Sequence, residues 1–335
     1  MDTTHHDTNR QLRPSGVILL NGRDMTTSPV ADVCIGVVVV TYNSSAHVER
    51  LTASLKDALS SVSHRVVVVD NASSDGTVAA LRGKGIEVIE MGRNAGYSAG
   101  INAGLAVLGD ASAVLILNPD LVLGRSAVEA MYAELGDPGV GVVVPQTREF
   151  SGVLAYNQRR DPTLLRAVAS TVLGAGRAGR WSTLSETIED TATYLRTRDI
   201  DWGVGAVMMI SRACLDAVGP WDESFFLYSE ETDYCQRVRR HGMVVRYTPG
   251  AVVLHRGGGG ANDCRLRSMM MVNKVRLYGR QHSRAATFAY LAASFLYEGT
   301  RGIGGSASAR ASAVALLRPS RRPPELQCCD SFLPS

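Results

Sequence analysis

Three short and continuously apolar runs constrain the fold of this chain more than any other feature. They cover Val37–Val40, Val66–Val69 and Val114–Leu117, and most of their side chains are β-branched. Such runs are typical of strands buried on both faces, as in a parallel sheet covered by helices. Amphipathic segments of helical length lie between them, at about 46–60 and 97–108. This alternation predicts βαβ units with right-handed crossovers.

The same alternation continues along the chain. We expect strands at 35–41, 65–70, 86–90, 113–118, 140–144 and 204–210, and further helices at 77–83, 125–136, 211–217 and 230–241. Ser229 and Gly242 are the expected N-cap and C-cap of the last of these helices. A final strand at 244–247 or 251–254 should end at His255. Residues 148–200 show few periodic signals and are predicted to be mobile.

These elements predict an α/β fold of Rossmann-like type, with a mostly parallel central sheet, helices on both faces and a C-terminal helical extension. We expect a flexible N-terminal tail at 1–32, the main domain at 33–265 and the helical extension at 266–318. The end of the chain, 319–335, is rich in proline and is expected to be disordered.

Composition excludes some classes of function. A net charge of +3 is too small to indicate a nucleic-acid partner. The six cysteines form no CxxC pair and follow no secretory signal, so we expect reduced thiols in a cytoplasmic protein. No apolar stretch reaches the roughly 18 residues that a membrane-spanning helix needs.

Polar residues stand where the apolar runs end. Thr41 and Asn43 follow the first run, Asp70 follows the second, and Asn118 and Asp120 follow the third. Open α/β sheets bind ligands at the carboxyl ends of their strands. This edge is therefore expected to bind a nucleotide and its metal, although Asp70 and Asp120 are also ordinary turn residues.

Five motifs in order resemble the family 2 inverting glycosyltransferases, which have a GT-A-type fold. They are Thr41-Tyr42-Asn43, the run from Asp70 to Thr77, the run from Asn94 to Gly100, Asn118-Pro119-Asp120 and Glu230-Glu231-Thr232-Asp233. The chain looks most like the rhamnosyltransferase-like branch, which acts on lipid-linked sugars. The resemblance covers about residues 35 to 256, roughly two thirds of the chain.

The resemblance implies roles for these residues. Asp70, Thr41 and Asn43 would bind the nucleoside, Asn94 and Gly96 would bring backbone N–H groups of a helix start to the donor, Asn118 would line the same site, and Trp202 would line the sugar. Asp120 and His255 would bind Mg²⁺ or Mn²⁺. Asn118 stands where the family usually has an aspartate, so binding of the metal would depend more on the nucleotide.

An inverting transfer also requires a base that takes the proton of the acceptor hydroxyl. The resemblance implies that Glu231 is this base, at a position where the family normally has Asp. Glu230 and Asp233 would support it. Acidic residues in the first turn of a helix also stabilise the helix dipole whatever the function, so a purely structural role stays open.

The expected function is inverting transfer of a hexosyl unit, L-rhamnose from dTDP-L-rhamnose, to a glycan or lipid-linked acceptor in cell-surface polysaccharide synthesis. A UDP-sugar donor and a non-catalytic sugar-nucleotide or glycan-binding protein remain alternatives. A nucleotidyltransferase is disfavoured, because Val37–Ser45 contains no Lys or Arg. The apolar face of 288–296 and the arginines that follow suggest peripheral contact with the membrane, or packing on the catalytic domain.

Overall fold

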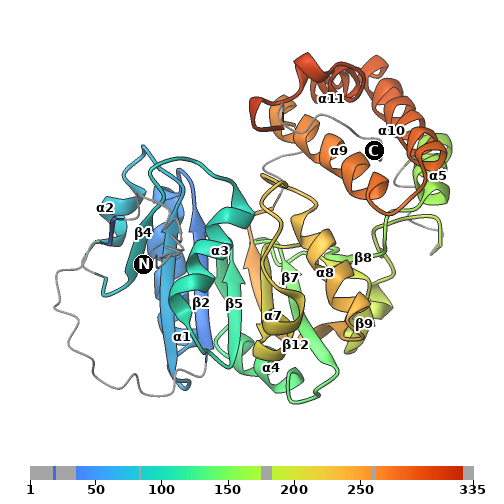
Figure 1. Ribbon diagram of the computed structural model, residues 1–335. Coiled ribbons are helices and arrows are strands. Elements are labelled where there is room, and N and C mark those ends of the chain that lie inside the picture. Colours follow the sequence, from blue (N-terminus) through green and yellow to red (C-terminus); the bar gives the residue numbers. More distant parts are fainter. Residues whose placement is uncertain (1–17, 20–34, 83, 175–182, 258–261, 327–335) are drawn as a thin grey trace, which may run out of the picture.

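The computed structural model describes residues 18–19, 35–82, 84–174, 183–257 and 262–326. One large mixed sheet forms the centre of the molecule, in the order β1-β4-β3-β2-β5-β11-β7-β12-β6, with β9 on β12 (Figure 1). The strands are β1 (Ile18–Leu19), β2 (Ile35–Thr41), β3 (His64–Asp70), β4 (Glu87–Glu90), β5 (Ala113–Leu117), β6 (Leu121–Leu123), β7 (Val140–Arg148), β9 (Arg198–Ile200), β11 (Val207–Ser211) and β12 (Val244–His255). A separate pair consists of β8 (Gln158–Arg159) and β10 (Trp202–Gly203).

Four neighbouring strands in the N-terminal half of the sheet are parallel, as the sequence predicts, and β1 pairs antiparallel with β4 at the edge. β4, β3, β2 and β5 are neighbours, and the register pairs Thr41 with Asp70 at the carboxyl edge. β11 then runs antiparallel between β5 and β7. The predicted α/β class with helices on both faces is confirmed, with antiparallel strands in its second half.

Two apolar cores lie on the two faces of this sheet. One face carries α1 (Ser45–Ala58), the short α2 (Thr77–Leu81) and α4 (Ala127–Glu134). The other carries α3 (Tyr97–Leu108), α7 (Arg212–Val218) and α8 (Glu230–Arg240). Together they cover strands whose apolar runs are fully buried.

Helix α3 packs unusually close to β2. A Cβ atom added at Gly100 would lie 2.6 Å from Val40, and one added at Gly104 would lie 2.6 Å from Val38. Only glycine permits this approach of helix to strand. The close packing places the N-terminus of α3 beside the carboxyl edge of the sheet.

The C-terminal extension is a helical bundle beside the sheet (Figure 1). It contains α9 (Cys264–Gly279), α10 (Arg284–Ile303) and α11 (Ala307–Leu317) around a separate apolar core. Helix α5 (Leu164–Leu173), drawn in green, joins these orange and red helices, and Thr171 Oγ1 donates to the Ala293 carbonyl at 3.0 Å. The extension therefore includes a helix from the middle of the chain.

Several sequence expectations were wrong for this part of the molecule. The region at 148–200, expected to be mobile, contains α5, β8, β9 and a 3₁₀ helix at Thr191–Leu195 among its described residues. Part of the tail expected to be disordered forms the 3₁₀ helices η2 (Pro319–Arg321) and η3 (Pro324–Leu326), and Leu326 is buried. Helix α11 buries mainly Ala and Ser, so its apolar pattern is weak although it packs tightly. Residues 327–335 lie outside the described residues.

The two alternatives for the last strand are one strand. β12 runs from Val244 to His255, and its register with β7 shifts between Thr248 and Val252. Pro249 and Gly250 fall within this shift and interrupt the apolar pattern. The strand ends at His255, as expected.

Candidate active site

The predicted nucleoside residues form one network at the carboxyl edge of β2 and β3. The carboxylate of Asp70 is buried and accepts hydrogen bonds from Thr41 Oγ1 at 2.8 Å, from Ser73 Oγ at 2.6 Å and from the Ser73 backbone N–H at 2.8 Å. Three donors hold one carboxylate in place. The arrangement fits the turn expected after β3, and it fixes the direction of Asp70 at the same time.

Asn43 lies across this turn and is exposed to solvent. Its backbone has a φ of +49°, which asparagine tolerates better than most residues. Asn43 Oδ1 accepts from the Ser74 N–H at 2.9 Å, and the Asn43 N–H donates to Ser73 Oγ at 2.8 Å. Asn43 thus joins the end of β2 to the turn after β3.

The start of α3 lies next to this network. Asn94 Oδ1 accepts from the Gly96 N–H at 3.2 Å, and Asn71 Nδ2 donates to the Gly96 carbonyl at 3.0 Å. Gly96 has a φ of +94°, and an added Cβ would lie 2.5 Å from the Phe226 carbonyl oxygen. Both the backbone conformation and the available space therefore require a glycine at this position. Because the glycine has no side chain, the loop before α8 can pack against the start of α3.

Asp120 and His255 meet as predicted for a metal pair. His255 Nε2 lies 3.1 Å from Asp120 Oδ1, and the Arg256 N–H donates to the Asp120 carbonyl at 3.2 Å. Burial tends to raise the pKa of Asp120, but the hydrogen bond and charge of His255 outweigh it, so the pKa lies below its ordinary value. Among the described residues no cluster of three or more His, Cys, Asp or Glu is arranged to hold a metal.

A pair of ligands is a reasonable fit for Mg²⁺ or Mn²⁺, which commonly take one or two protein groups and complete their coordination with phosphates and water. Asn118 stands between β5 and Asp120, and its N–H donates to the Ala206 carbonyl at 2.8 Å. This bond ties the segment that carries Asp120 to the start of β11.

Glu230 and Glu231 begin α8 and are the most perturbed carboxylates of the site. Each has one oxygen, Oε2, that is buried and lacks a hydrogen-bond partner among the described residues. Burial raises the pKa of both groups, and the neighbouring charge of Glu231 raises that of Glu230 further. Backbone N–H groups and Arg159 partly offset the effect on Glu231. Burial therefore favours the protonated form of both groups, and the charge of Arg159 favours the ionised form of Glu231.

Glu231 also faces a glycine. A Cβ added at Gly205 would lie 3.0 Å from the Cβ of Glu231, so a larger residue there would displace the glutamate. The Gly205 carbonyl accepts from Tyr97 Oη at 3.2 Å. These contacts join the start of α8 to the start of α3.

Tyr97 is the residue that sequence reasoning missed. Burial raises its pKa well above the ordinary value, and the charges of Glu230, Glu231 and Asp120 raise it further. One tyrosine therefore lies within electrostatic reach of both the candidate base and the candidate metal carboxylate. Its place directly after Gly96 was visible in the sequence, but its contact with Gly205, more than 100 residues away, was not.

Two predicted residues make contacts that the sequence does not reveal. The carboxylate of Asp233 binds Arg237 Nε at 2.8 Å in an ion pair within α8. Trp202 Nε1 donates to the Arg160 carbonyl at 2.9 Å, and the Arg159 guanidinium lies 6.0 Å from the centre of the Trp202 ring. Trp202 is half-buried and lies beside Arg159, whose charge acts on Glu231. The expected helix cap at Ser229 forms no side-chain hydrogen bond, because its φ is +76°.

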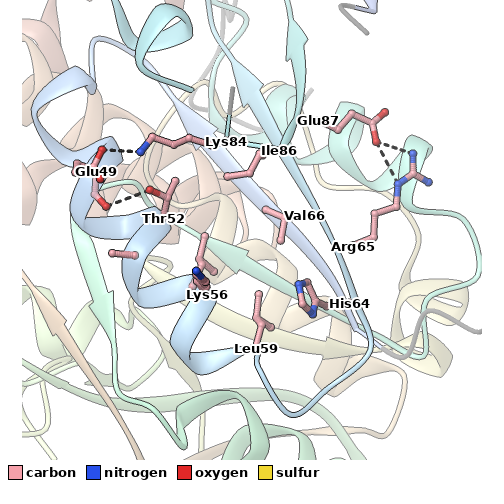
Figure 2. Close-up of a pocket in the computed structure, with 13 residues that line it drawn as sticks. Glu49, Thr52, Lys56, Leu59, His64, Arg65, Val66, Lys84, Ile86 and Glu87 are labelled. Atoms are coloured by element: carbon pink, nitrogen blue, oxygen red, sulfur yellow. Dashed lines mark hydrogen bonds and ion pairs between the residues drawn. The ribbon is translucent and has the colours of Figure 1, made fainter. Parts of the chain in front are cut away.

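A hollow of about 700 Å³ elsewhere contains none of the candidate site residues. Figure 2 shows it between α1 and the strands β3 and β4, with His64 at the amino end of β3. Ion pairs join Lys84 to Glu49 at 2.6 Å and Arg65 to Glu87 at 2.7 Å at its borders. It is at the opposite end of β3 from Asp70, so it is separate from the candidate active site.

The model of glycosyl transferase family 2 matches residues 36–214. N-acetylglucosaminyl-diphospho-decaprenol L-rhamnosyltransferase of Mycobacterium tuberculosis is 31% identical over 235 residues, which cover 65% of this chain and 75% of that protein. The low-salt glycan biosynthesis hexosyltransferase Agl10 of Haloferax volcanii is 28% identical over 214 residues, 62% of each chain.

A solved structure supports the fold. The mannosyltransferase PcManGT of Pyrobaculum calidifontis, in complex with GDP-Man and Mn²⁺, has a TM-score of 0.54 and 18% sequence identity, and the match covers 91% of this chain and 87% of that one. None of the described helices is long and apolar enough to cross a membrane. The matching family model and the rhamnosyltransferase relative together show that the chain is a glycosyltransferase and belongs to glycosyl transferase family 2.

Proposed function

We propose that this glycosyltransferase moves L-rhamnose from dTDP-L-rhamnose to a hydroxyl of a lipid-linked glycan, with inversion at the anomeric carbon. The observation that carries the proposal is the pair of adjacent carboxylates at the start of α8, Glu230 and Glu231, each with a buried oxygen that has no hydrogen-bond partner among the described residues. The choice of sugar and acceptor rests on the 31% identity to an L-rhamnosyltransferase that acts on an N-acetylglucosaminyl-diphospho lipid.

In this proposal the residues of the site have separate roles. Thr41, Asn43 and Asp70 hold the nucleoside, and the N–H groups at the start of α3 face the diphosphate. Asp120 and His255 hold a divalent cation, which when bound neutralises charge on the departing diphosphate. The N-terminus of α3, after Gly96, carries a partial positive charge and stabilises the negative charge of the diphosphate as well.

Glu231 acts as general base in the proposal. It takes the proton from the acceptor hydroxyl on the face of the sugar opposite the diphosphate, which is the geometry of an inverting transfer. In this proposal Glu230 holds a proton, because two negative charges so close together in a buried site are costly. Arg159 and the backbone groups around Gly205 favour the ionised form of Glu231.

The test is release of nucleotide diphosphate from a panel of donors. dTDP-L-rhamnose and UDP-sugars are compared, with an N-acetylglucosaminyl-diphospho-polyprenol acceptor, with Mg²⁺ or Mn²⁺ and with a chelator. The proposal predicts acceptor-dependent and metal-dependent turnover with dTDP-L-rhamnose. Turnover with a UDP-sugar alone would keep the mechanism and remove rhamnose.

A thermal-shift panel separates a transferase from a binding protein. Ligands that bind only the folded state raise the unfolding temperature. Selective stabilisation by dTDP without turnover of any donor in the presence of acceptor would favour the non-catalytic alternative. The absence of stabilisation by dTDP, UDP and GDP would count against both.

A further inference from the structure

A hollow of about 690 Å³ lies in the C-terminal extension, between the first turn of α9, the second half of α11 and the two 3₁₀ helices. Its lining contains five arginines and, among the described residues, no Asp or Glu. These arginines are Arg265, Arg310, Arg318, Arg321 and Arg322. A concave surface lined by one sign of charge concentrates ions of the opposite sign.

The arginines are held in different ways. Arg322 is only 6% exposed, and its Nε donates to the Ala315 carbonyl at 3.4 Å. Arg310 Nη1 donates to the Gly302 carbonyl at 2.9 Å, and Arg265 pairs with Glu325. The fold therefore fixes three of these cations around the hollow.

Arg318 and Arg321 complete the set on the exposed side. Within the part of the chain that the structure describes, neither has a carboxylate within ion-pair distance. Like charges around one hollow repel each other, and a bound anion would relieve this repulsion. Arginine is the side chain best suited to phosphate, because its planar fork donates two parallel hydrogen bonds.

Three exposed aliphatic side chains line the same hollow or lie next in the chain to one of its arginines or to a residue that contacts one, and we call these three the aliphatic rim. Val314 lines it and is 42% exposed, and Leu317, almost one turn further along α11, is 55% exposed. Ile303 is 90% exposed and follows Gly302, which is in contact with Arg310. Arginines beside exposed aliphatic residues are typical of surfaces that lie in the headgroup region of a membrane.

We propose that this hollow binds the phosphate groups of anionic membrane lipids and holds the extension against the membrane. The choice of a lipid rather than free phosphate rests on the aliphatic rim and, in part, on the proposed function, whose acceptor is lipid-linked. Cys264 follows His255 by nine residues, which span at most about 32 Å. A docked membrane would thus lie within reach of the candidate metal pair.

The test measures binding of the full chain to vesicles of phosphatidylcholine, with and without phosphatidylglycerol, in the absence of donor sugar. The proposal predicts binding to the anionic vesicles that weakens as salt is raised. Arg318→Gln/Arg321→Gln should bind about thirtyfold more weakly, from about 1 kcal/mol for each arginine at the surface. The matched variant Arg82→Gln/Arg125→Gln removes the same charge from exposed sites of the α/β domain and should bind like the parent chain.

A second arm separates lipid from free anion. Ile303→Ser/Leu317→Ser keeps all five arginines, so it should weaken vesicle binding while stabilisation by inorganic pyrophosphate persists. Equal loss in the two arginine variants, or vesicle binding unaffected by the rim variant, would overturn the proposal. Vesicle binding is measured without a donor sugar, so its outcome does not depend on sugar transfer. Sugar transfer is tested separately with a water-soluble acceptor.

Discussion

Glu230 and Glu231 are adjacent residues with different electrostatic environments. Glu230 is buried and Glu231 is half-buried, and Arg159 and the backbone near Gly205 favour the ionised form of Glu231. Two negative charges so close in a buried site are costly, so one proton stays on the pair. The sequence placed both acids at a helix start, and the division of roles between them comes from the structure.

Glu230→Gln should change how stability depends on pH. The pKa of Glu230 is raised in the folded state, so its contribution to stability is present at low pH and is lost as pH rises through that raised pKa. Glutamine cannot ionise and avoids this loss. The unfolding temperature of the variant relative to the parent chain should therefore increase from pH 5 to pH 9. A constant difference across this range would show that Glu230 is not a perturbed acid.

At the same scale, the sequence predicted the residues at the carboxyl edge well. Asp70 meets Thr41 because the parallel strands β2 and β3 end at one edge, and Asp120 meets His255 because β6 pairs antiparallel with β12, with Leu121 opposite His255. Tyr97 could not be found in this way, since its role depends on a contact with Gly205 across the fold. The ion pair of Asp233 with Arg237 was not part of the prediction either, because the acids were considered only for the base and the helix dipole.

At the scale of elements, the segment before α8 joins three parts of the molecule. Tyr228 and Ser229 have φ values of +70° and +76°, which are strained for residues with side chains. Buried Asn273 of α9 donates to the carbonyls of Leu227 at 2.9 Å and Tyr228 at 3.2 Å. The N–H of Tyr97 donates to the Phe226 carbonyl at 2.7 Å. The extension thus holds the strained entry to Glu230 and Glu231.

Asn273→Ala and Asn273→Asp should lower kcat by about ten- to a hundredfold with a smaller change in KM for the donor. Both variants lose the donated bonds to the loop, whereas Asp keeps an acceptor for Arg276 Nη1, which lies 2.7 Å from Asn273 Oδ1. A displacement of about 1 Å can cost a hundredfold in rate. Steady-state kinetics and unfolding temperatures of both variants provide the measurement.

A purely structural role of Asn273 would give a different pattern. Asn273→Asp would then recover kcat along with stability, because its bond to Arg276 is kept. Asn262→Ala, an exposed asparagine just before α9, serves as the control and should leave both quantities unchanged.

The sequence predicted elements well where the apolar period is strong. β2 and α3 have the expected bounds of 35–41 and 97–108. Helix α5 was not predicted, because it leaves several apolar side chains exposed, and the bounds of α11 within the expected helical extension were not predicted, because it packs through Ala and Ser. Such helices are stabilised by tertiary packing, which local patterns do not reveal.

At the scale of the whole molecule, a buried ion pair joins two helices of the extension. Arg267 Nε and Nη2 bind the carboxylate of Glu298 at 2.7 and 2.6 Å, and the Glu298 side chain is fully buried. Its hydrogen bond and charge raise the pKa of Arg267. Removal of one partner leaves a buried charge without compensation.

Glu298→Ala should therefore destabilise the protein by about 3–5 kcal/mol, measured by denaturant unfolding. The double variant Arg267→Met/Glu298→Met replaces both charges with apolar groups and should recover much of this loss. A double variant as unstable as the single one would show that packing, and not the unpaired charge, sets the cost.

The most direct test of Glu231 as the general base compares the parent chain with Glu231→Gln. The measurement is acceptor-dependent release of dTDP from dTDP-L-rhamnose, with binding of dTDP determined on the same preparations. If Glu231 is the base, Glu231→Gln should lower turnover by a factor of about 10²–10⁴ and leave binding of dTDP unchanged. The neighbouring Glu230→Gln should lower turnover much less. Turnover by Glu231→Gln within a few-fold of the parent chain would contradict the role of Glu231 as the base.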